Sequence, residues 1–384
     1  MKSVTVLGAI ASSTALTEAA KSLWVNNTPL SVQPYAILKG HGTPLGGGDV
    51  WNRFPVSGNS SGGAFTIMTT HGPGDLRAGP PGLFPHVHKK TYENFFATKG
   101  RIQLWAQGLD GFLKGTTQQL TRILTKGDFG AVPQNGIHTF KVLDHDSTLT
   151  GVLVPGGFEE FFFAMSKPTF NPTALNTWDV YPQLNFTPRA DAVNSKGGEG
   201  NWYNGPNTLP GSNANPYFIA KNYGPKYIND KHGYYQIITP LVTGKESNNQ
   251  FAQGHITMDL KRGNKTSPTQ KVAQHMAFML EEGELHVGVE GYDEVRLIEG
   301  DIVFVPKNTP FTYYAGAEFT KFMYVSGGGD GLDATLIQGG KPTSKAVYPV
   351  SQDEATAFSA PGISDGGKGG KGGMPMLRIP GFRI

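Results

Sequence analysis

The chain contains no cysteine, so disulfides, thiolate nucleophiles and cysteine-ligated metals are excluded. A metal site in this protein must therefore use histidines and carboxylates. Charge is also scarce, because charged residues make up 16% of the 384 residues and the net charge is +3. This balance is too small to indicate a nucleic-acid or membrane partner. Beyond the N-terminus, no apolar stretch is long enough to span a bilayer.

The chain is instead rich in turn-forming residues, with 52 glycines and 27 prolines. This composition favours many short strands joined by turns over long helices. Three segments also recur further along the chain in the same order. The pairs are GDFGAVPQN (127–135) with GDIVFVPKN (300–308), KGRIQLWAQ (99–107) with EGELHVGVE (282–290), and VLVPGGFEE (152–160) with MYVSGGGDG (323–331). The repeat predicts two copies of one domain.

Short runs of alternating polar and apolar residues predict antiparallel strands in both copies. The runs are 101–105, 130–134, 138–142 and 150–154 in the first copy, and 284–289, 294–298, 301–306, 311–315 and 321–326 in the second. Many short strands without helical runs between them are typical of jelly-roll barrels. We therefore expect an all-β fold with two jelly-roll barrels in one chain and few short helices. The best helix candidate is 330–337, with Asp330 as its N-cap.

Two of the ten histidines, His86 and His88, stand two residues apart in FPHVHKKTYENFF (84–96). On a strand, residues two apart point to the same face, so both imidazoles suit one metal ion. Glu93 has the wrong parity to join them on an uninterrupted strand. It joins them only if the polar residues after His88 form a turn and Glu93 opens the next strand.

The repeated segment supplies a third histidine, His138, after GDFGAVPQNGI. Because a jelly roll brings distant hairpins to one interior, the histidine pair, Glu93 and His138 are expected to converge inside the first barrel. Three imidazoles and a carboxylate suit one divalent first-row metal with an open position. Phe95 and Phe140 each lie two residues beyond a ligand and have the parity to share its interior face, as a wall for a flat aromatic ligand or as ordinary core.

The second copy lacks these ligands. By counting, the positions that match His86, His88, Glu93 and His138 are Thr269, Lys271, Met276 and Phe311. His275 lies one position from the glutamate register and is a weak candidate ligand. The second barrel is therefore expected to be metal-free and mainly structural.

These patterns divide the chain into five parts. They are a weak secretory signal peptide (1–20), an N-terminal barrel with the metal site (30–165), a linker rich in Pro, Asn, Thr and Gly (166–215), a C-terminal barrel without a metal site (216–345) and a glycine-rich tail (346–384). Four Asn-X-Ser/Thr sequons also agree with secretion and N-glycosylation, at Asn26, Asn59, Asn185 and Asn264. We expect a secreted protein, with a cytoplasmic one as the alternative.

The two histidine segments resemble the motifs of the cupins. HVHKKTYENFFATKG is similar to the first motif, H-X-H-X4-E-X6-G, and GDFGAVPQNGIH to the second, G-X5-P-X4-H, with Asn135 where a glycine is usual. The segments YENF, QLWAQ, VPGGFE, DVY, FTPR, PYFIA, GPKY and GGGDGLD follow the order found in fungal-type quercetin 2,3-dioxygenases. This resemblance runs from about Pro34 to Val347, so it covers two cupin barrels and the linker.

The resemblance implies a flavonol dioxygenase that opens the central ring of quercetin with O2 and releases carbon monoxide and a depside. It implies one metal ion, copper in the fungal branch, with iron, manganese, nickel or cobalt as the other options. The three histidines match the family's ligands, and Glu93 matches a glutamate that both ligates and acts as the base. We expect apolar surroundings to raise the pKa of Glu93, so that it accepts the proton of the flavonol 3-hydroxyl. The oligomeric state is left open, with a homodimer as one option.

The resemblance also indicates a substrate pocket. Met68, Thr70, Gly151, Leu153 and Phe158 match pocket positions of the family, and Trp51 stands where a tyrosine is expected at the entrance. The absence of cysteine and the glycine-rich tail depart from the family. Two alternatives are another bicupin oxygenase or decarboxylase and a non-enzymatic ligand-binding or storage bicupin. The lost second site argues against the decarboxylase, and the complete ligand set argues against the storage protein.

Overall fold

The structure, a computed structural model, describes residues 20–47, 50–72, 85–165, 186–189, 191–192, 207–232, 234–260 and 266–347. All of them belong to one compact unit, Met1–Tyr348. The expected signal peptide lies outside the described residues except for residue 20. So do most of the expected linker and all of the expected tail beyond residue 347.

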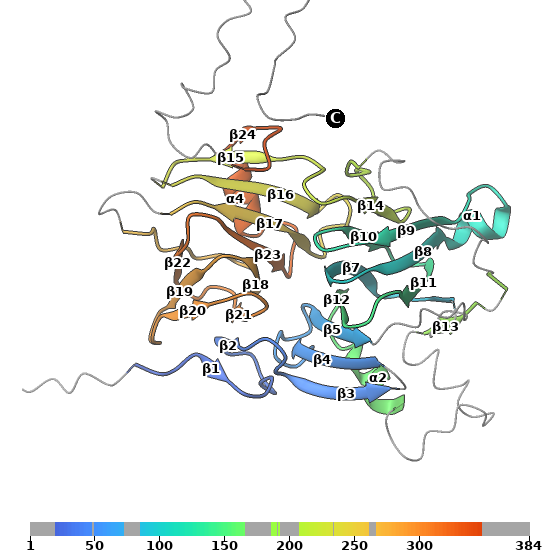
Figure 1. The fold of residues 1–384 in the computed structure, drawn as a ribbon, viewed down its shortest axis with the longest axis horizontal. Helices are drawn as coiled ribbons and strands as arrows, with labels where there is room; N and C mark the ends of the chain where they lie inside the picture. Colours follow the sequence, from blue (N-terminus) through green and yellow to red (C-terminus); the bar gives the residue numbers. More distant parts are fainter. Residues whose placement is uncertain are drawn as a thin grey trace, which may run out of the picture. The chain divides into compact units, whose positions relative to one another are not determined.

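The first barrel consists of a seven-stranded and a five-stranded sheet (Figure 1). The larger sheet has the order β14 (Tyr217–Ile219), β10 (Phe129–Val132), β7 (Tyr92–Lys99), β12 (Ser147–Val154), β5 (Thr66–Gly72), β4 (Val50–Val56) and β3 (Thr43–Gly47). The smaller sheet has the order β13 (Thr187–Pro188), β6 (His86–Val87), β11 (Gly136–Val142), β8 (Ile102–Gly108) and β9 (Leu120–Leu124).

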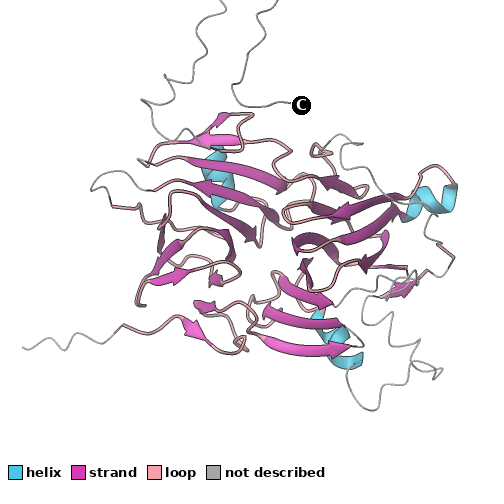
Figure 2. Ribbon diagram, viewed as in Figure 1, coloured by secondary structure: helices cyan, strands magenta, loops and turns pink. Residues whose placement is uncertain are grey.

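The second barrel consists of a nine-stranded and a three-stranded sheet. The larger has the order β1 (Trp24–Val25), β2 (Tyr35–Ile37), β21 (Ile302–Val305), β18 (Met276–Glu282), β23 (Thr320–Ser326), β17 (Ala252–Met258), β16 (Gln236–Val242), β15 (Tyr227–Asn229) and β24 (Lys341–Pro342). The smaller has β20 (Val295–Leu297), β19 (Leu285–Val289) and β22 (Phe311–Ala315). The described helices are short: α1 (Leu109–Lys114), α2 (Glu159–Met165) and α4 (Leu332–Gln338). Figure 2 shows that strands dominate, so the expected all-β fold with few short helices is confirmed.

Strands β7 and β18 are covered on both faces, so nearly all their residues are buried. In β7, Phe95 packs in the interior of the first barrel, whereas Phe96 points the other way into a separate cluster. In β18, Phe278 lies inside the second barrel, and Met279 joins the same cluster as Phe96. Side chains of both large sheets meet in that cluster, so the two barrels pack against each other through it.

Two short strands join the sheet of the opposite barrel. Strand β2 lies in the part expected to form the first barrel, yet it pairs with β21 of the second. Strand β14 lies in the part expected to form the second barrel, yet it pairs with β10 of the first. A strand edge offers unpaired N–H and C=O groups to any extended segment nearby, and alternation along the sequence does not reveal which segment takes them.

The turns of the two barrels confirm the internal repeat. Asn135 and Asn308, the last residues of the two repeated nonamers, have φ angles of 64° and 60°. Asparagine is one of the few residues besides glycine that adopts this left-handed conformation at low cost. Asn135 therefore fills the position where the cupin motif usually has glycine.

The helix expected at 330–337 is present as α4, but its cap was predicted wrongly. Gly331 is the N-cap, and no side chain caps the helix. The Asp330 carboxylate instead accepts a hydrogen bond from the Gln274 amide at 2.8 Å. Among the described residues, no helix has the length and apolar character needed to cross a bilayer.

Candidate metal centre and substrate pocket

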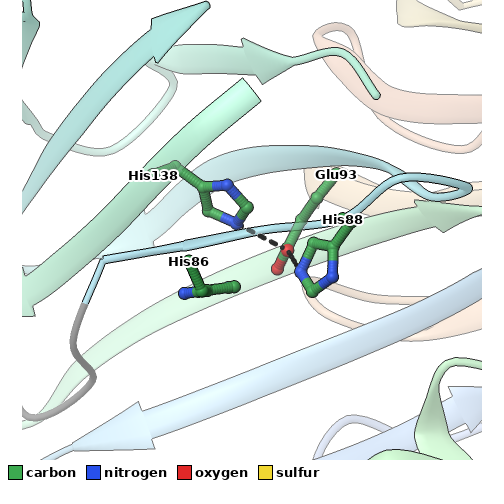
Figure 3. Close-up of side chains that lie close together, drawn as sticks. All are labelled: His86, His88, Glu93 and His138. Carbon is green, nitrogen blue, oxygen red and sulfur yellow. Dashed lines mark hydrogen bonds and ion pairs between the residues drawn. The ribbon is translucent and has the colours of Figure 1, made fainter. Parts of the chain in front are cut away.

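Three elements of the first barrel bring His86, His88, Glu93 and His138 together. His86 opens β6 and lies directly opposite His138 of β11 in an antiparallel pair. His88 follows β6, the chain bends over the next two residues, and Glu93 is the second residue of β7. The predicted sequence of strand, turn and strand is thus present. Figure 3 shows the four side chains facing one another.

The four side chains are buried and close enough to hold one ion. Each offers a ligand atom, and these atoms all lie within 4.8 Å of one another. The Oε2 atom of Glu93 lies 3.0 Å from Nε2 of His88 and 3.0 Å from Nε2 of His138. Ligand atoms placed tetrahedrally about 2.0–2.1 Å from a metal are separated by roughly 3.3 Å. The observed spacing is therefore close to that of a coordination sphere.

The protonation of His138 provides a second test of the fit. Its Nδ1–H donates to the Gly136 carbonyl at 3.0 Å, and a carbonyl oxygen only accepts. In neutral His138 the other nitrogen, Nε2, then carries a lone pair, and it faces the Glu93 carboxylate at 3.0 Å. Two acceptors at this distance require positive charge between them, either a proton or a metal ion. The site therefore fits a bound cation.

The pKa of Glu93 differs from the expectation. Burial raises this pKa, but the hydrogen bonds and charge of His138 and His88 outweigh burial and hold it well below its usual range. The expected rise is therefore wrong. Apolar surroundings alone would have produced it, but the histidines that share the site reverse the sign. Glu93 is an ionised carboxylate, which is the form that binds a metal.

The second barrel lacks the ligand set, but two of its matching positions were predicted wrongly. The residue that pairs with Phe311, as His86 pairs with His138, is Gln270. Val272 accepts a hydrogen bond from Asn308, as His88 does from Asn135, so it corresponds to His88. The turn that follows is one residue shorter than in the first barrel, which shifts the count from Thr269 and Lys271.

No metal-binding group forms around His275 within the described residues, where the four residues of the first barrel make the one group of suitable ligands. Nδ1 of His275 instead accepts a hydrogen bond from the backbone N–H of Lys307 at 3.2 Å. Its ring also stacks on Phe304 at 5.7 Å. These contacts give His275 a packing role.

Aromatic and apolar side chains flank the metal ligands on two sides. Phe95 is buried, contacts the His138 ring edge to face at 5.6 Å and packs on the half-buried Phe140. On the other side, the ring of Phe158 contacts His88 at 4.5 Å. Phe158 belongs to a cluster with Met68 and Leu153. The five side chains therefore form two walls, one beside His138 and one beside His88.

Two more expected pocket residues lie beside these walls. Gly151 pairs with Met68 on one side and with Phe95 on the other, so it sits between the two walls. The Thr70 hydroxyl is buried and donates to the Asn52 side-chain oxygen at 2.7 Å. Asn52 was not predicted, and the pair adds polar groups to an otherwise apolar surface.

Trp51 is not brought together with the other expected pocket residues. It is 59% exposed. Since successive side chains of a strand point to opposite faces, it also faces away from its buried neighbour Asn52. The structure thus separates this residue from the metal ligands.

The structure adds two aromatic residues that sequence reasoning missed. Phe186 is buried and stacks on His86 with 4.4 Å between ring centroids, and Phe161 stacks on Phe186 at 4.7 Å. Phe186 belongs to the FTPR segment, whose resemblance to the family was noted without assigning a role. Phe161 lies in α2, three residues after Phe158, which immediately precedes that helix, and this spacing would have predicted a common face.

A buried carboxylate holds α2 in place beside the site. Glu159 accepts hydrogen bonds from the Gly58 backbone N–H at 2.6 Å and from the Thr66 hydroxyl at 2.6 Å. The hydrogen bonds thereby hold two aromatic side chains near Glu159 in place: Phe158, which contacts His88, and Phe161, which stacks on Phe186.

The chain resembles one known protein over most of its length and a second over a smaller part. It is 38% identical to the quercetin 2,3-dioxygenase of Aspergillus japonicus over 355 residues, which cover 86% of this chain and 99% of that protein. It is 30% identical to the quercetin 2,3-dioxygenase of Bacillus subtilis over 149 residues, which cover 39% of this chain and 40% of that protein. No protein-family model matches the chain.

Among solved structures, the chain resembles oxalate decarboxylase from Bacillus subtilis. Two variants of that protein superpose with TM-scores of 0.48 and 0.47, at 12% and 13% identity, over 78% of each chain. Similarity at this level supports no conclusion by itself.

Proposed function

Because the chain belongs to the quercetin 2,3-dioxygenase family, we propose that it cleaves the central ring of a flavonol with O2 and releases carbon monoxide and a depside. The observation that carries the proposal is the buried His3Glu group of the first barrel, whose four ligand atoms converge. The family relationship supplies the reaction, and this group supplies the place where it would occur.

We propose one divalent metal per chain, held by His86, His88, Glu93 and His138. Affinity for nitrogen and oxygen ligands rises along the first row to a maximum at Cu²⁺, so copper is our first choice. A bound divalent metal would act as a Lewis acid that makes the flavonol 3-hydroxyl easier to deprotonate. Iron, manganese, nickel and cobalt are the alternatives to test.

Glu93 is the proposed base. Both histidine contacts fall on its Oε2 atom, so its Oε1 atom takes part in neither of them. One carboxylate can thus serve the ligand sphere with one oxygen and receive the substrate proton on the other. Because its pKa is lowered, Glu93 is ionised and ready to accept, but it is a weak base. The hydroxyl must therefore be acidified before the proton moves.

The two walls are the proposed binding surface for the flat flavonol. Phe95 and Phe140 would contact it beside His138, and Met68, Leu153 and Phe158 beside His88. These apolar side chains would exclude water from the reacting atoms, as aromatic-lined sites commonly do. Gly151 leaves the space between the walls open, because it has no side chain. Thr70, paired with Asn52, is the group we assign to a substrate hydroxyl.

Secretion and glycosylation are further parts of the proposal. Asn26 and Asn59 are exposed, as glycan acceptors must be. Asn185 and Asn264 lie outside the described residues. A loss of mass after treatment of the natively produced protein with an N-glycosidase would support the assignment, and an unchanged mass would contradict it.

The activity is tested by incubating the purified protein with quercetin under air. Loss of the flavonol absorbance with release of carbon monoxide is the expected result. The protein is loaded in turn with copper, iron, manganese, nickel and cobalt, and metal content is measured in each sample. No turnover with any stoichiometrically bound metal would reject the dioxygenase assignment. The absence of stoichiometric metal would favour a ligand-binding protein.

A further inference from the structure

A column of aromatic rings begins at one metal ligand. The rings of His86 and Phe186 are stacked, with centroids 4.4 Å apart and planes at 18°. Phe161 stacks on Phe186 at 4.7 Å and 14°, and Phe158, which also contacts the ligand His88 at 4.5 Å, stacks on Phe161 at 5.4 Å and 16°. Phe186 is 1% exposed. It therefore connects His86 to the rest of the column, and its ring also meets the His88 ring edge to face at 6.0 Å.

The chain around Phe186 is fastened to the strand that carries His86. Thr187 and Pro188 form β13, which pairs with Val87 and His86 of β6. The backbone N–H of the next residue, Arg189, donates to the Pro85 carbonyl at 2.7 Å. Strand β6 has only two residues, and β13 covers the edge that β11 leaves open. A segment from between the barrels thus completes the sheet at the metal site.

The side chain of Arg189 adds a second fastening. Its guanidinium lies over the Phe112 ring at 5.3 Å. It also makes two hydrogen bonds to the Asp191 carboxylate, at 2.7 and 3.0 Å. Such contacts of a planar guanidinium fix direction as well as distance. The end of β13 is therefore held against the outside of the barrel while Phe186 points into it.

Two of the ligand histidines show different contacts. His138 is held by its hydrogen bond to the Gly136 carbonyl, which fixes both ring plane and protonation. His86 has a parallel ring against one of its faces, which restricts rotation about its side-chain bonds. We propose that Phe186 is a positioning residue for the metal centre, which sets the plane of the His86 ring through the stack. This inference rests on the metal site of the proposed function, but not on the flavonol reaction.

The test compares two buried phenylalanines that belong to the same hydrophobic cluster. Phe186→Leu keeps apolar bulk but removes the stacking ring. Phe54→Leu is the matched control, because Phe54 is fully buried and its ring contacts Phe162 and Phe163, not a ligand histidine. Cu²⁺ and Co²⁺ affinities are measured by competition with a chelator, in the absence of flavonol. The electron paramagnetic resonance spectrum of the Cu²⁺ form reports the ligand geometry.

We expect Phe186→Leu to weaken Cu²⁺ binding by roughly threefold to tenfold and to change the spectrum, as the loss of one aromatic contact predicts. Phe186→Tyr should restore both, because it keeps the ring. Phe54→Leu should lower the thermal unfolding midpoint and leave affinity and spectrum unchanged. The proposal is overturned if Phe186→Leu binds Cu²⁺ like the parent, or if Phe54→Leu has the same effect on the spectrum.

Arg189→Gln also tests whether the segment that carries Phe186 positions His86, and it does so without creating a cavity. It replaces Phe186→Leu if that variant does not fold. Loosening the segment should weaken Cu²⁺ binding in the same direction, by a smaller factor. Unchanged binding and spectrum in this variant would count against positioning by the segment. Because metal binding is measured without turnover, a failure here leaves the dioxygenase assignment standing. A parent that binds metal but does not cleave flavonol rejects the assignment and not this inference.

Discussion

Each barrel buries one glutamate beside a histidine, and the two arrangements differ in where their positive charge comes from. In the second barrel, Glu281 accepts from Nδ1 of His255 at 2.5 Å and pairs with Nζ of Lys321 at 3.3 Å. In the first, Glu93 lies 3.0 Å from the nitrogens of both His88 and His138. Burial raises the pKa of each carboxyl, and in each case the partners outweigh burial and lower it.

The difference shows how one fold makes one barrel structural and the other suited to a metal. Lys321 brings a permanent charge, so the cluster around Glu281 is neutral without any added ion. Burial lowers the pKa of His255, which keeps this histidine neutral. Glu93 has imidazole partners, and its charge is balanced by a proton or a metal ion. A buried carboxylate is suited to bind a metal where its partners do not include a lysine or arginine that balances its charge.

The two glutamates also point to different parts of the molecule. Glu93 shares its face of β7 with Phe95, inside the first barrel. Glu281 shares its face of β18 with Met279, which packs between the barrels. The His255 ring contacts Phe96 of the first barrel at 5.1 Å. The ionic cluster therefore belongs to the contact between barrels, and the metal ligands belong to an interior.

The largest expected effect comes from removing the histidine partner of each buried glutamate, His138 for Glu93 and His255 for Glu281. His138→Ala should lower metal affinity by more than roughly 100-fold and abolish turnover, because a direct ligand matters more than an outer contact. His255→Ala should keep one metal per chain. Metal content after dialysis and the rate of flavonol loss are the measurements. If His255→Ala also lost its metal, the distinction between the two buried pairs would be wrong.

The next effect separates the two roles assigned to Glu93. Glu93→Gln keeps an oxygen for the metal but cannot accept a proton, so turnover should fall by roughly 10²- to 10⁴-fold while most metal is retained. Glu281→Gln is the matched variant and should keep the parent's rate wherever it remains folded. The rate per bound metal decides the question. Full activity of Glu93→Gln would remove this residue as the base.

Glu281→Gln should instead affect stability. It leaves the Lys321 charge buried without a partner, which typically costs about 3–5 kcal/mol of unfolding free energy. Adding Lys321→Met should recover most of the loss, because the unpaired charge is then gone. Chemical denaturation of the metal-free proteins measures both. If Glu281→Gln alone were as stable as the parent, the cluster would contribute nothing to the contact between barrels.

The same cluster predicts a dependence on acid. The pKa of Glu281 is about 2 in the folded chain, against an ordinary value of 4.5. A lowered carboxyl pKa stabilises the fold at pH values above about 4.5, and this contribution is lost as the pH falls toward 2. Glu281→Gln should therefore flatten the stability profile in that window.

The sequence predicted the elements and the ligands because both depend on local spacing. Alternation located the strands from β8 to β23 that it named, and the parity of His86, His88 and Glu93 predicted the turn between β6 and β7. Pairing over long distances was not predictable in this way. The exchange of β2 and β14 between barrels, and the stack of Phe186 on His86, depend on which edges meet in three dimensions.

The errors of the sequence reasoning have related causes. Counting from a distant glycine made Thr269 the equivalent of His86 in the second barrel. The count was wrong because the sequence does not show that one turn is a residue shorter until the strands are paired. The pKa of Glu93 was expected to rise because apolar residues surround it in the sequence. Its sign depends instead on two nitrogens 3.0 Å away, which only the fold brings there.

The smallest expected effect concerns Asp333, a buried acid of the second barrel. Burial raises the pKa of Asp333, in the first turn of α4, to about 6 from an ordinary 3.8, although the backbone N–H groups of Asp333 and Ala334 and the Tyr324 hydroxyl lower it. The folded chain then binds more protons than the unfolded chain between these values. Stability should therefore fall as the pH rises from about 4 to 6.

Asp333→Asn should remove this decline and stabilise the protein at pH 7 by at most about 3 kcal/mol, the free energy of a shift of that size. Denaturation at pH 4, 5, 6 and 7 measures the profile. Asp330→Asn is the control, because Asp330 is exposed beside the same helix and its charge is the smallest of the causes that shift the Asp333 pKa, so the profile should change little. If Asp333→Asn were less stable than the parent at pH 7, the buried carboxylate would have a partner. The second barrel would then supply a partner for the charge of Asp333, as it does for that of Glu281.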